Sequence, residues 1–247
     1  IARLLGDPEW GGRYQSVRAL GDLRAKEYAP DIAKLLGDPD KDVRAYAAKA
    51  LGGLGAKEFS SQITTLLGDE ERVVWNAAVE ALGGLNAKLS PPQIARLLGD
   101  PRSDVRASVT EALGWLGAKE FAPDIARLLG DPEWLARAHA TEALGKLGAK
   151  EHVLDVARLL GDPDSSVRRA AATALCDFGA KEHAAGIAKL LGDPSEYVRH
   201  DAVEALIRLG ARELAQAIAK LLADPDQDVR QAAAEALKKL GVPLPPP

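Results

Sequence analysis

The sequence predicts an all-α fold, a solenoid of about eight two-helix repeats of 31 residues each. The first observation is a constant period, because a Leu-Leu-Gly-Asp or Leu-Leu-Ala-Asp tetrad recurs at a spacing typical of stacked repeat arrays. The second is composition: 47% of the residues are apolar, mainly Ala and Leu, and only 4% are aromatic. Such a composition favours packed helices without strands. The tetrads begin at Leu4, Leu35, Leu66, Leu97, Leu128, Leu159, Leu190 and Leu221.

Each repeat is expected to begin with a long helix, and the second repeat shows why. Gly37 ends the preceding helix, Asp38 is placed to cap the next one, and Pro39 suits a first helical position. From residue 40 to 54 apolar residues recur at helical spacing, and Gly55 ends the helix. The predicted core residues of this helix are Val43, Ala47, Ala50, Leu51 and Leu54.

A shorter helix is expected to follow the turn Gly-Ala-Lys-Glu. Apolar residues from Phe59 to Leu67 lie at amphipathic helical spacing, and Gly68 ends the segment. Gly52 is small where we expect the helices of neighbouring repeats to approach closely. Cys176 occupies the equivalent position, which predicts a buried small side chain rather than a reactive thiol.

The ends of the sequence differ from the repeats. Residues 1–5 match the second half of a short helix, so we expect residues 1–241 to form a single solenoid that is a fragment of a longer array. Residues 242–247 are rich in proline, which predicts an extended tail.

Charge and hydropathy exclude several partners. The 36 acidic and 32 basic residues are mixed along the chain, with a net charge of −4, so we expect no nucleic-acid partner. Apolar runs are too short for a membrane span, and no leader peptide opens the chain, so no membrane partner is expected. A single cysteine requires no oxidising compartment, which makes the cytoplasm the default location.

The Asp-Pro-x-x-x-Val-Arg start and the Ala-Ala-x-Ala-Leu-Gly core resemble HEAT repeats, in particular the short HEAT-like class named after phycobilisome lyases. They are also similar to the artificial alphaRep binders. This resemblance covers the whole chain and implies a right-handed superhelix. It also implies a ladder of aspartates and arginines, six positions apart, between neighbouring repeats. The matching pairs are Asp7 and Arg13, Asp38 and Arg44, Asp100 and Arg106, Asp131 and Arg137, Asp162 and Arg168, Asp193 and Arg199, and Asp224 and Arg230.

The third repeat departs from the pattern. Asp69 has Trp75 in place of the arginine six positions on, Glu70 replaces the proline, and Asn86 replaces the glycine. Irregular segments such as Gly11-Gly12 are costly choices for a designer, which favours a natural array. A selected artificial binder of the alphaRep type remains the alternative.

Sequence variation is concentrated at outward positions of the long helices. At 100° per residue, Asp42 and Tyr46 point away from the side that holds Val43 and Leu51. The column containing Asp42 changes freely among the repeats, as a framework position would not. In HEAT-like arrays the second helix of each unit lines the concave side, so the resemblance implies one continuous groove. Solenoids bind partners in such grooves.

Large aromatic residues at these positions are the residue type that anchors protein interfaces. The sequence therefore predicts a non-catalytic scaffold that binds a protein or peptide in the groove. Trp75, which stands in the arginine column, is expected to fill a gap between helices instead. The predicted partner-binding residues are Trp10, Tyr14, Asp42, Tyr46, Trp115, Trp134, Leu135, Arg169, Tyr197, His200 and Arg208.

The residue pattern disfavours a catalytic function. No phosphate loop, nucleophile elbow or paired catalytic carboxylates occur, and most aspartates recur as helix caps. His152 and His183 share an apolar column, whereas His139 and His200 lie two repeats apart, so neither a metal site nor a cofactor is expected. Two alternatives stay open: a bilin lyase-like role, or another role in handling a small ligand. The oligomeric state stays unknown.

Overall fold

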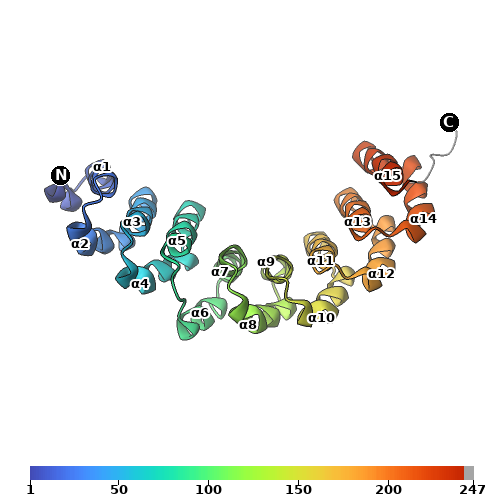
Figure 1. The fold of residues 1–247 in the computed structure, drawn as a ribbon, viewed down its shortest axis with the longest axis horizontal. Helices are drawn as coiled ribbons and strands as arrows, with labels where there is room; N and C mark the ends of the chain where they lie inside the picture. The colour runs from blue at the N-terminus through green and yellow to red at the C-terminus, as the bar shows by residue number, and fades with distance from the viewer. Residues whose placement is uncertain (242–247) are drawn as a thin grey trace. The chain divides into compact units, whose positions relative to one another are not determined.

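A computed structural model describes residues 1–241, except for the side chain of Pro91, and these residues contain helices and turns but no strand. The predicted proline-rich tail, residues 242–247, lies outside the described residues. The chain divides into two compact units, Ile1–Ala118 and Lys119–Pro247. Within each unit the long helices form one layer and the short helices a second layer (Figure 1).

The N-terminal unit contains four long helices. They are α1 (Trp10–Asp22), α3 (Lys41–Leu54), α5 (Arg72–Leu85) and α7 (Ser103–Leu116). Its short helices are α2 (Ala29–Lys34), α4 (Ser60–Thr65) and α6 (Pro91–Leu98). The 3-10 turns of this unit are Ala2–Gly6, Lys26–Tyr28, Leu35–Gly37, Lys57–Phe59 and Leu66–Gly68.

The C-terminal unit repeats this plan. Its long helices are α9 (Trp134–Leu147), α11 (Ser165–Asp177), α13 (Glu196–Leu209) and α15 (Gln227–Leu240). Its short helices are α8 (Ala122–Arg127), α10 (Val153–Arg158), α12 (Ala184–Lys189) and α14 (Ala215–Ala219). The 3-10 turns are Lys119–Phe121, Leu128–Gly130, Lys150–His152, Leu159–Gly161, Lys181–His183, Leu190–Gly192, Arg212–Leu214 and Lys220–Ala223.

The cap predicted at Asp38 was wrong. The Asp40 carboxylate accepts hydrogen bonds from the backbone N–H groups of Asp42 and Val43, so Asp40 caps α3. Asp38 instead accepts from the Asp40 N–H, in the turn before the helix. Pro39 therefore lies outside the helix, because the chain is still extended at Asp40. The predicted short helix from Phe59 to Leu67 is also divided, since α4 is flanked by two 3-10 turns.

Side-chain burial follows the predicted core, and close helix contacts use the small residues. Val43, Ala47, Leu51 and Leu54 are buried, whereas Ala50 is half-buried. A Cβ atom added at Gly52 would lie 2.8 Å from the Cα of Ala81, so glycine is required where α3 meets α5. Cys176 is buried, as predicted, with its Sγ 3.8 Å from the Ala205 carbonyl oxygen.

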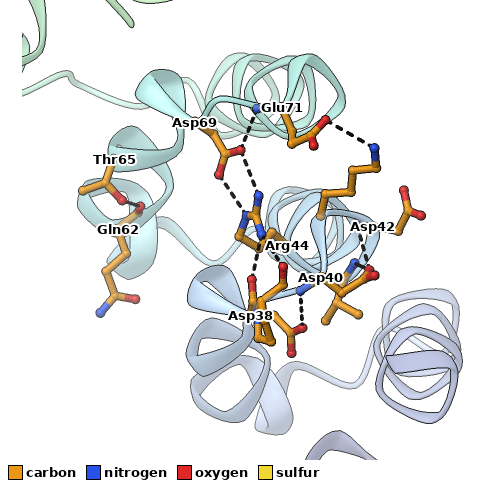
Figure 2. Close-up of polar contacts among 11 residues, drawn as sticks. Asp38, Asp40, Asp42, Arg44, Gln62, Thr65, Asp69 and Glu71 are labelled. Carbon is orange, nitrogen blue, oxygen red and sulfur yellow. Dashed lines mark hydrogen bonds and ion pairs between the residues drawn. The ribbon is translucent and has the colours of Figure 1, made fainter. Parts of the chain in front are cut away.

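Arginines connect consecutive repeats, and Arg44 is the example drawn in Figure 2. Its Nε and Nη2 donate to the two carboxylate oxygens of Asp69 at 2.9 and 3.0 Å, and Nη1 donates to the carbonyl of Asp38 at 2.8 Å. The carboxylate contact thus spans 25 residues, while the aspartate six positions back contributes its backbone carbonyl. The same contacts join Arg13 to Asp38, Arg137 to Asp162, Arg168 to Asp193 and Arg199 to Asp224. Arg106 donates to the Asp100 carbonyl in the same way.

The irregular third repeat keeps the arginine contact of its own Asp69. The contact that is lost is the one to Asp100, in the fourth repeat. Asp69 has its arginine, whereas Asp100 pairs with Arg102, at 3.2 Å, because Trp75 stands in the arginine column. The Trp75 side chain is buried, with 4% exposed, beneath the Arg72 guanidinium. Arg72 reaches across to Glu111 of α7 at 3.5 Å, so α5 and α7 share an ion pair between an exposed arginine and a half-buried glutamate in place of the ladder contact.

Candidate partner-binding surfaces

A groove of about 500 Å³ in the C-terminal unit is lined by α11, α13 and α15. Tyr197, in the first turn of α13, has 62% of its surface exposed. Arg169 reaches this groove from α11, and Gln231 and Glu235 reach it from α15. The outward positions of three consecutive long helices therefore supply the lining.

An ion pair holds one side of this groove in place. The Arg169 Nε donates to the Asp201 Oδ2 at 2.6 Å, and the Arg169 guanidinium lies 5.8 Å from the centre of the Tyr197 ring. A second hollow, of about 240 Å³, lies beside the first and also includes Arg169 and Asp201 in its lining. The Arg169–Asp201 pair thus contributes to both hollows.

The groove has a strongly acidic lining. Arg169 and Lys239 are its only lysine or arginine side chains, and His200 adds an imidazole. The carboxylates are those of Glu196, Asp201, Glu204, Asp226, Asp228 and Glu235. Several carboxylates near an exposed aromatic ring favour cationic ligands, through charge and through contact with the ring face.

His200, Asp201 and Glu204 form a cluster that the sequence analysis did not identify. One potential metal-ligating atom from each lies within 4.8 Å of the others. The Nδ1 of His200 is 3.3 Å from the Oδ1 of Asp201. The sequence analysis compared His200 only with the distant His139, whereas the three clustered side chains lie on the same helix at positions i, i+1 and i+4. This spacing was visible in the sequence.

Three other predicted residues of the C-terminal unit lie outside the larger groove. Trp134 has 44% of its surface exposed at the start of α9, and the adjacent Leu135 is half-buried. Arg208 donates to the Asp177 carboxylate at 2.6 Å, and Asp177 lines the second hollow. Arg169, Tyr197 and His200 are therefore the predicted residues that the structure brings together in the larger groove.

The N-terminal unit has an aromatic cluster on α1 and α3. The ring centres of Trp10 and Tyr14 are 6.2 Å apart, and those of Tyr14 and Tyr46 are 4.5 Å apart, both in edge-to-face arrangements. A hydrogen bond with Tyr46 raises the pKa of Tyr14, and the charge of nearby Asp42 acts in the same direction. The two tyrosines are half-buried against each other, and Trp10 is half exposed.

Trp115 is separate from that cluster along α7. Its surface is 63% exposed, and its indole Nε1 lies 3.5 Å from a carboxylate oxygen of Glu111. Trp75 is buried, in agreement with a packing role rather than a partner-binding one. The single groove predicted along the whole chain spans both units and stays a prediction.

The sequence profile of HEAT repeats matches residues 1–83, 90–158, 122–206 and 156–238, which together span most of the chain. The chain belongs to the HEAT-repeat family. No functionally curated protein matches this HEAT sequence.

Solved structures share the HEAT fold. The Escherichia coli protein YibA is similar at 20% identity, with a TM-score of 0.60 over 97% of this chain and 90% of that chain. An engineered protein is similar at 19% identity, with a TM-score of 0.53 over 97% of this chain and 77% of that chain. These similarities show the fold alone.

Phycocyanin lyase from Nostoc sp., a complex of CpcE and CpcF, matches at 22% identity over 97% of this chain and 92% of that chain, with a TM-score of only 0.43. That value is too low to support a statement about activity. Within residues 1–241 of this HEAT chain, no helix has the length and hydropathy needed to cross a bilayer.

Proposed function

We propose that this HEAT-repeat chain is a non-catalytic scaffold that binds a protein segment on the outward positions of its long helices. The observation that supports this proposal is the groove of the C-terminal unit. It combines an exposed tyrosine with a hollow of about 500 Å³ and polar side chains from three helices. Interface energy concentrates at such aromatic residues, and solenoids bind partners along their stacked helices.

Charge favours a partner segment that contains lysine or arginine. Glu204 and Glu235 are exposed carboxylates on facing helices, so neither is satisfied by a buried ion pair. A basic side chain placed between them gains attraction from both without a large desolvation cost. The same charges disfavour a nucleic-acid backbone.

The test uses two labelled peptides of equal length, one of alternating glycine and lysine and one of alternating glycine and glutamate. Fluorescence anisotropy with the whole chain should detect binding of the lysine peptide alone, and the affinity should fall as salt is added. Y197A should weaken binding about tenfold, because it removes the aromatic contact. The double variant E204Q/E235Q should also weaken binding and reduce its salt dependence.

L154A is the matched control. Leu154 is an equally exposed large side chain of the same unit, but it lies on the short helix α10. This substitution should leave the affinity unchanged. Equal binding of the two peptides, or equal losses in Y197A and L154A, would contradict the proposed groove.

A further inference from the structure

We infer that His200, Asp201 and Glu204 form a binding site for a late first-row divalent transition ion of the zinc class. This inference does not rest on the proposed peptide binding. Within residues 1–241, these side chains form the one group of three or more such residues whose potential ligand atoms all lie within 4.8 Å of one another. Metal–ligand bonds of about 2.0–2.2 Å at the tetrahedral angle place ligand atoms roughly 3.4 Å apart, so side-chain rotations that draw the three atoms together would complete the site.

Helix geometry places Glu204 beside both His200 and Asp201. His200 and Glu204 are separated by four positions on α13, so their side chains lie one turn apart on the same face. Asp201 is adjacent to His200 and three positions before Glu204. An uninterrupted helix therefore fixes the spacing of the ligands, and no loop has to rearrange.

A neighbouring helix orients the aspartate. Arg169 of α11 holds the Asp201 Oδ2 at 2.6 Å, which leaves Oδ1 directed toward the His200 ring, 3.3 Å away. Contacts of this kind around a ligand fix its rotamer and strengthen metal binding. The arginine is in turn placed over the Tyr197 ring.

The ligand types select the class of ion. One imidazole and two carboxylates suit zinc, cobalt or nickel, whereas calcium and magnesium prefer oxygen ligands alone. Half-buried His200 and exposed Glu204 border an open groove, so water would fill the remaining coordination positions. Asp228 and Glu235 line the same groove and add negative potential without belonging to the cluster.

Isothermal titration of the whole chain with zinc chloride tests the site. The wild-type chain should take up one equivalent of zinc with higher affinity than calcium or magnesium. H200A should bind zinc at least tenfold more weakly, and E204Q should also lose affinity. H183A is the matched control, because His183 is a histidine next to a carboxylate residue, Glu182, but lies in the turn before α12, and it should bind zinc as the wild type does.

A second measurement needs no variant. Added cobalt should broaden the ring-proton resonances of one of the four histidines before the others, and the broadened residue should be His200. The inference would be overturned if H200A bound zinc as tightly as the wild-type chain, or if calcium bound as tightly as zinc. Cobalt broadening of another histidine first would overturn it as well.

Discussion

Arg44 makes contacts in two directions, to carbonyl oxygens of its own repeat and to the Asp69 carboxylate of the next repeat. The guanidinium suits this position because its planar set of N–H groups can bind both at once, which a lysine ammonium cannot. Both side chains of the pair are nearly buried. The contact should therefore stabilise the stack more than an exposed ion pair would.

Two aspartates of the chain can be compared directly, because Asp69 pairs with a ladder arginine and Asp100 does not. D69N should lower the free energy of unfolding by about 2–3 kcal/mol, because it removes the charge opposite a nearly buried arginine. D100N should cost clearly less than D69N, because the ion pair of Asp100 is made with the exposed Arg102. Urea unfolding followed by circular dichroism measures both values.

These two variants also share their local turn. Each aspartate accepts a hydrogen bond from the backbone N–H two residues on, and the asparagine oxygen can still accept it. The difference between the variants thus isolates the arginine contact. Losses of equal size in both would show that the ladder adds nothing beyond the turn.

The helix cap shows where residue-level prediction stopped. Asp38 and Asp40 are both good capping residues in front of the same helix, and Pro39 is compatible with either choice. The backbone decides between them, because Asp40 is the last extended residue before α3. Capping preferences alone cannot decide between two aspartates that are two positions apart. The repeat period and the apolar spacing, in contrast, were enough to predict the helix itself.

Neighbouring long helices of the N-terminal unit do not all pack equally closely. Where α3 meets α5, a Cβ at Gly52 would clash with backbone and side-chain atoms of Ala81. At the equivalent position between α5 and α7, the nearest atom to a Cβ at Gly83 is the Leu116 Cδ2, 3.8 Å away. The α5–α7 seam is therefore more open at this position, and it also lacks the ladder arginine.

Alanine substitutions should report this difference with opposite signs. G52A should lower the free energy of unfolding by about 1–3 kcal/mol, because α3 and α5 must move apart to admit the methyl group. G83A should raise it by up to about 1 kcal/mol, because alanine favours the helix and meets no close neighbour. Thermal and urea unfolding give the two values, and destabilisation by G83A would contradict the open seam.

The sequence indicated that the third repeat is irregular, but it did not predict which contact between repeats is lost. Trp75, Glu70 and Asn86 marked the third repeat as irregular. The structure places the missing ion-pair partner at Asp100, one repeat later. Each arginine reaches forward by 25 residues, so a substitution in one repeat removes a contact from the next.

At the scale of the whole molecule, four carboxyls of the ladder link stability to pH. Burial works against the charged forms of Asp38, Asp162 and Asp193, but hydrogen bonds from arginine and backbone N–H groups outweigh it, so their pKa values lie below the ordinary 3.8. The hydrogen bond from Arg199 is the main cause of the lowered pKa of Asp224. All four prefer to be charged in the folded chain.

A lowered folded pKa means that the unfolded chain takes up protons first as the pH falls. The free energy of unfolding should therefore be level from about pH 7 to pH 5 and should decline below about pH 4. Urea unfolding at a series of pH values measures this, with D193N as the comparison. D193N should show a shallower decline, and a stability that rises on acidification would contradict the linkage.

The candidate site was predicted less completely than the fold. Repetition identifies the core and the outward columns, so Arg169, Tyr197 and His200 were recognised as surface residues. Their convergence with Glu204 and Glu235 depends on how three helices pack, and the 31-residue period contains no information about residues that do not repeat. The acidic character of the groove was hidden by an overall charge of only −4.

The position of Trp75 gives the protein an internal optical probe. Trp10, Trp115 and Trp134 are open to solvent, so acrylamide reaches their indole rings and quenches their fluorescence. Trp75 is buried on α5, so the emission that survives the quencher comes mainly from this one residue. Loss of the packing around Trp75 can therefore be followed by fluorescence in the unlabelled chain.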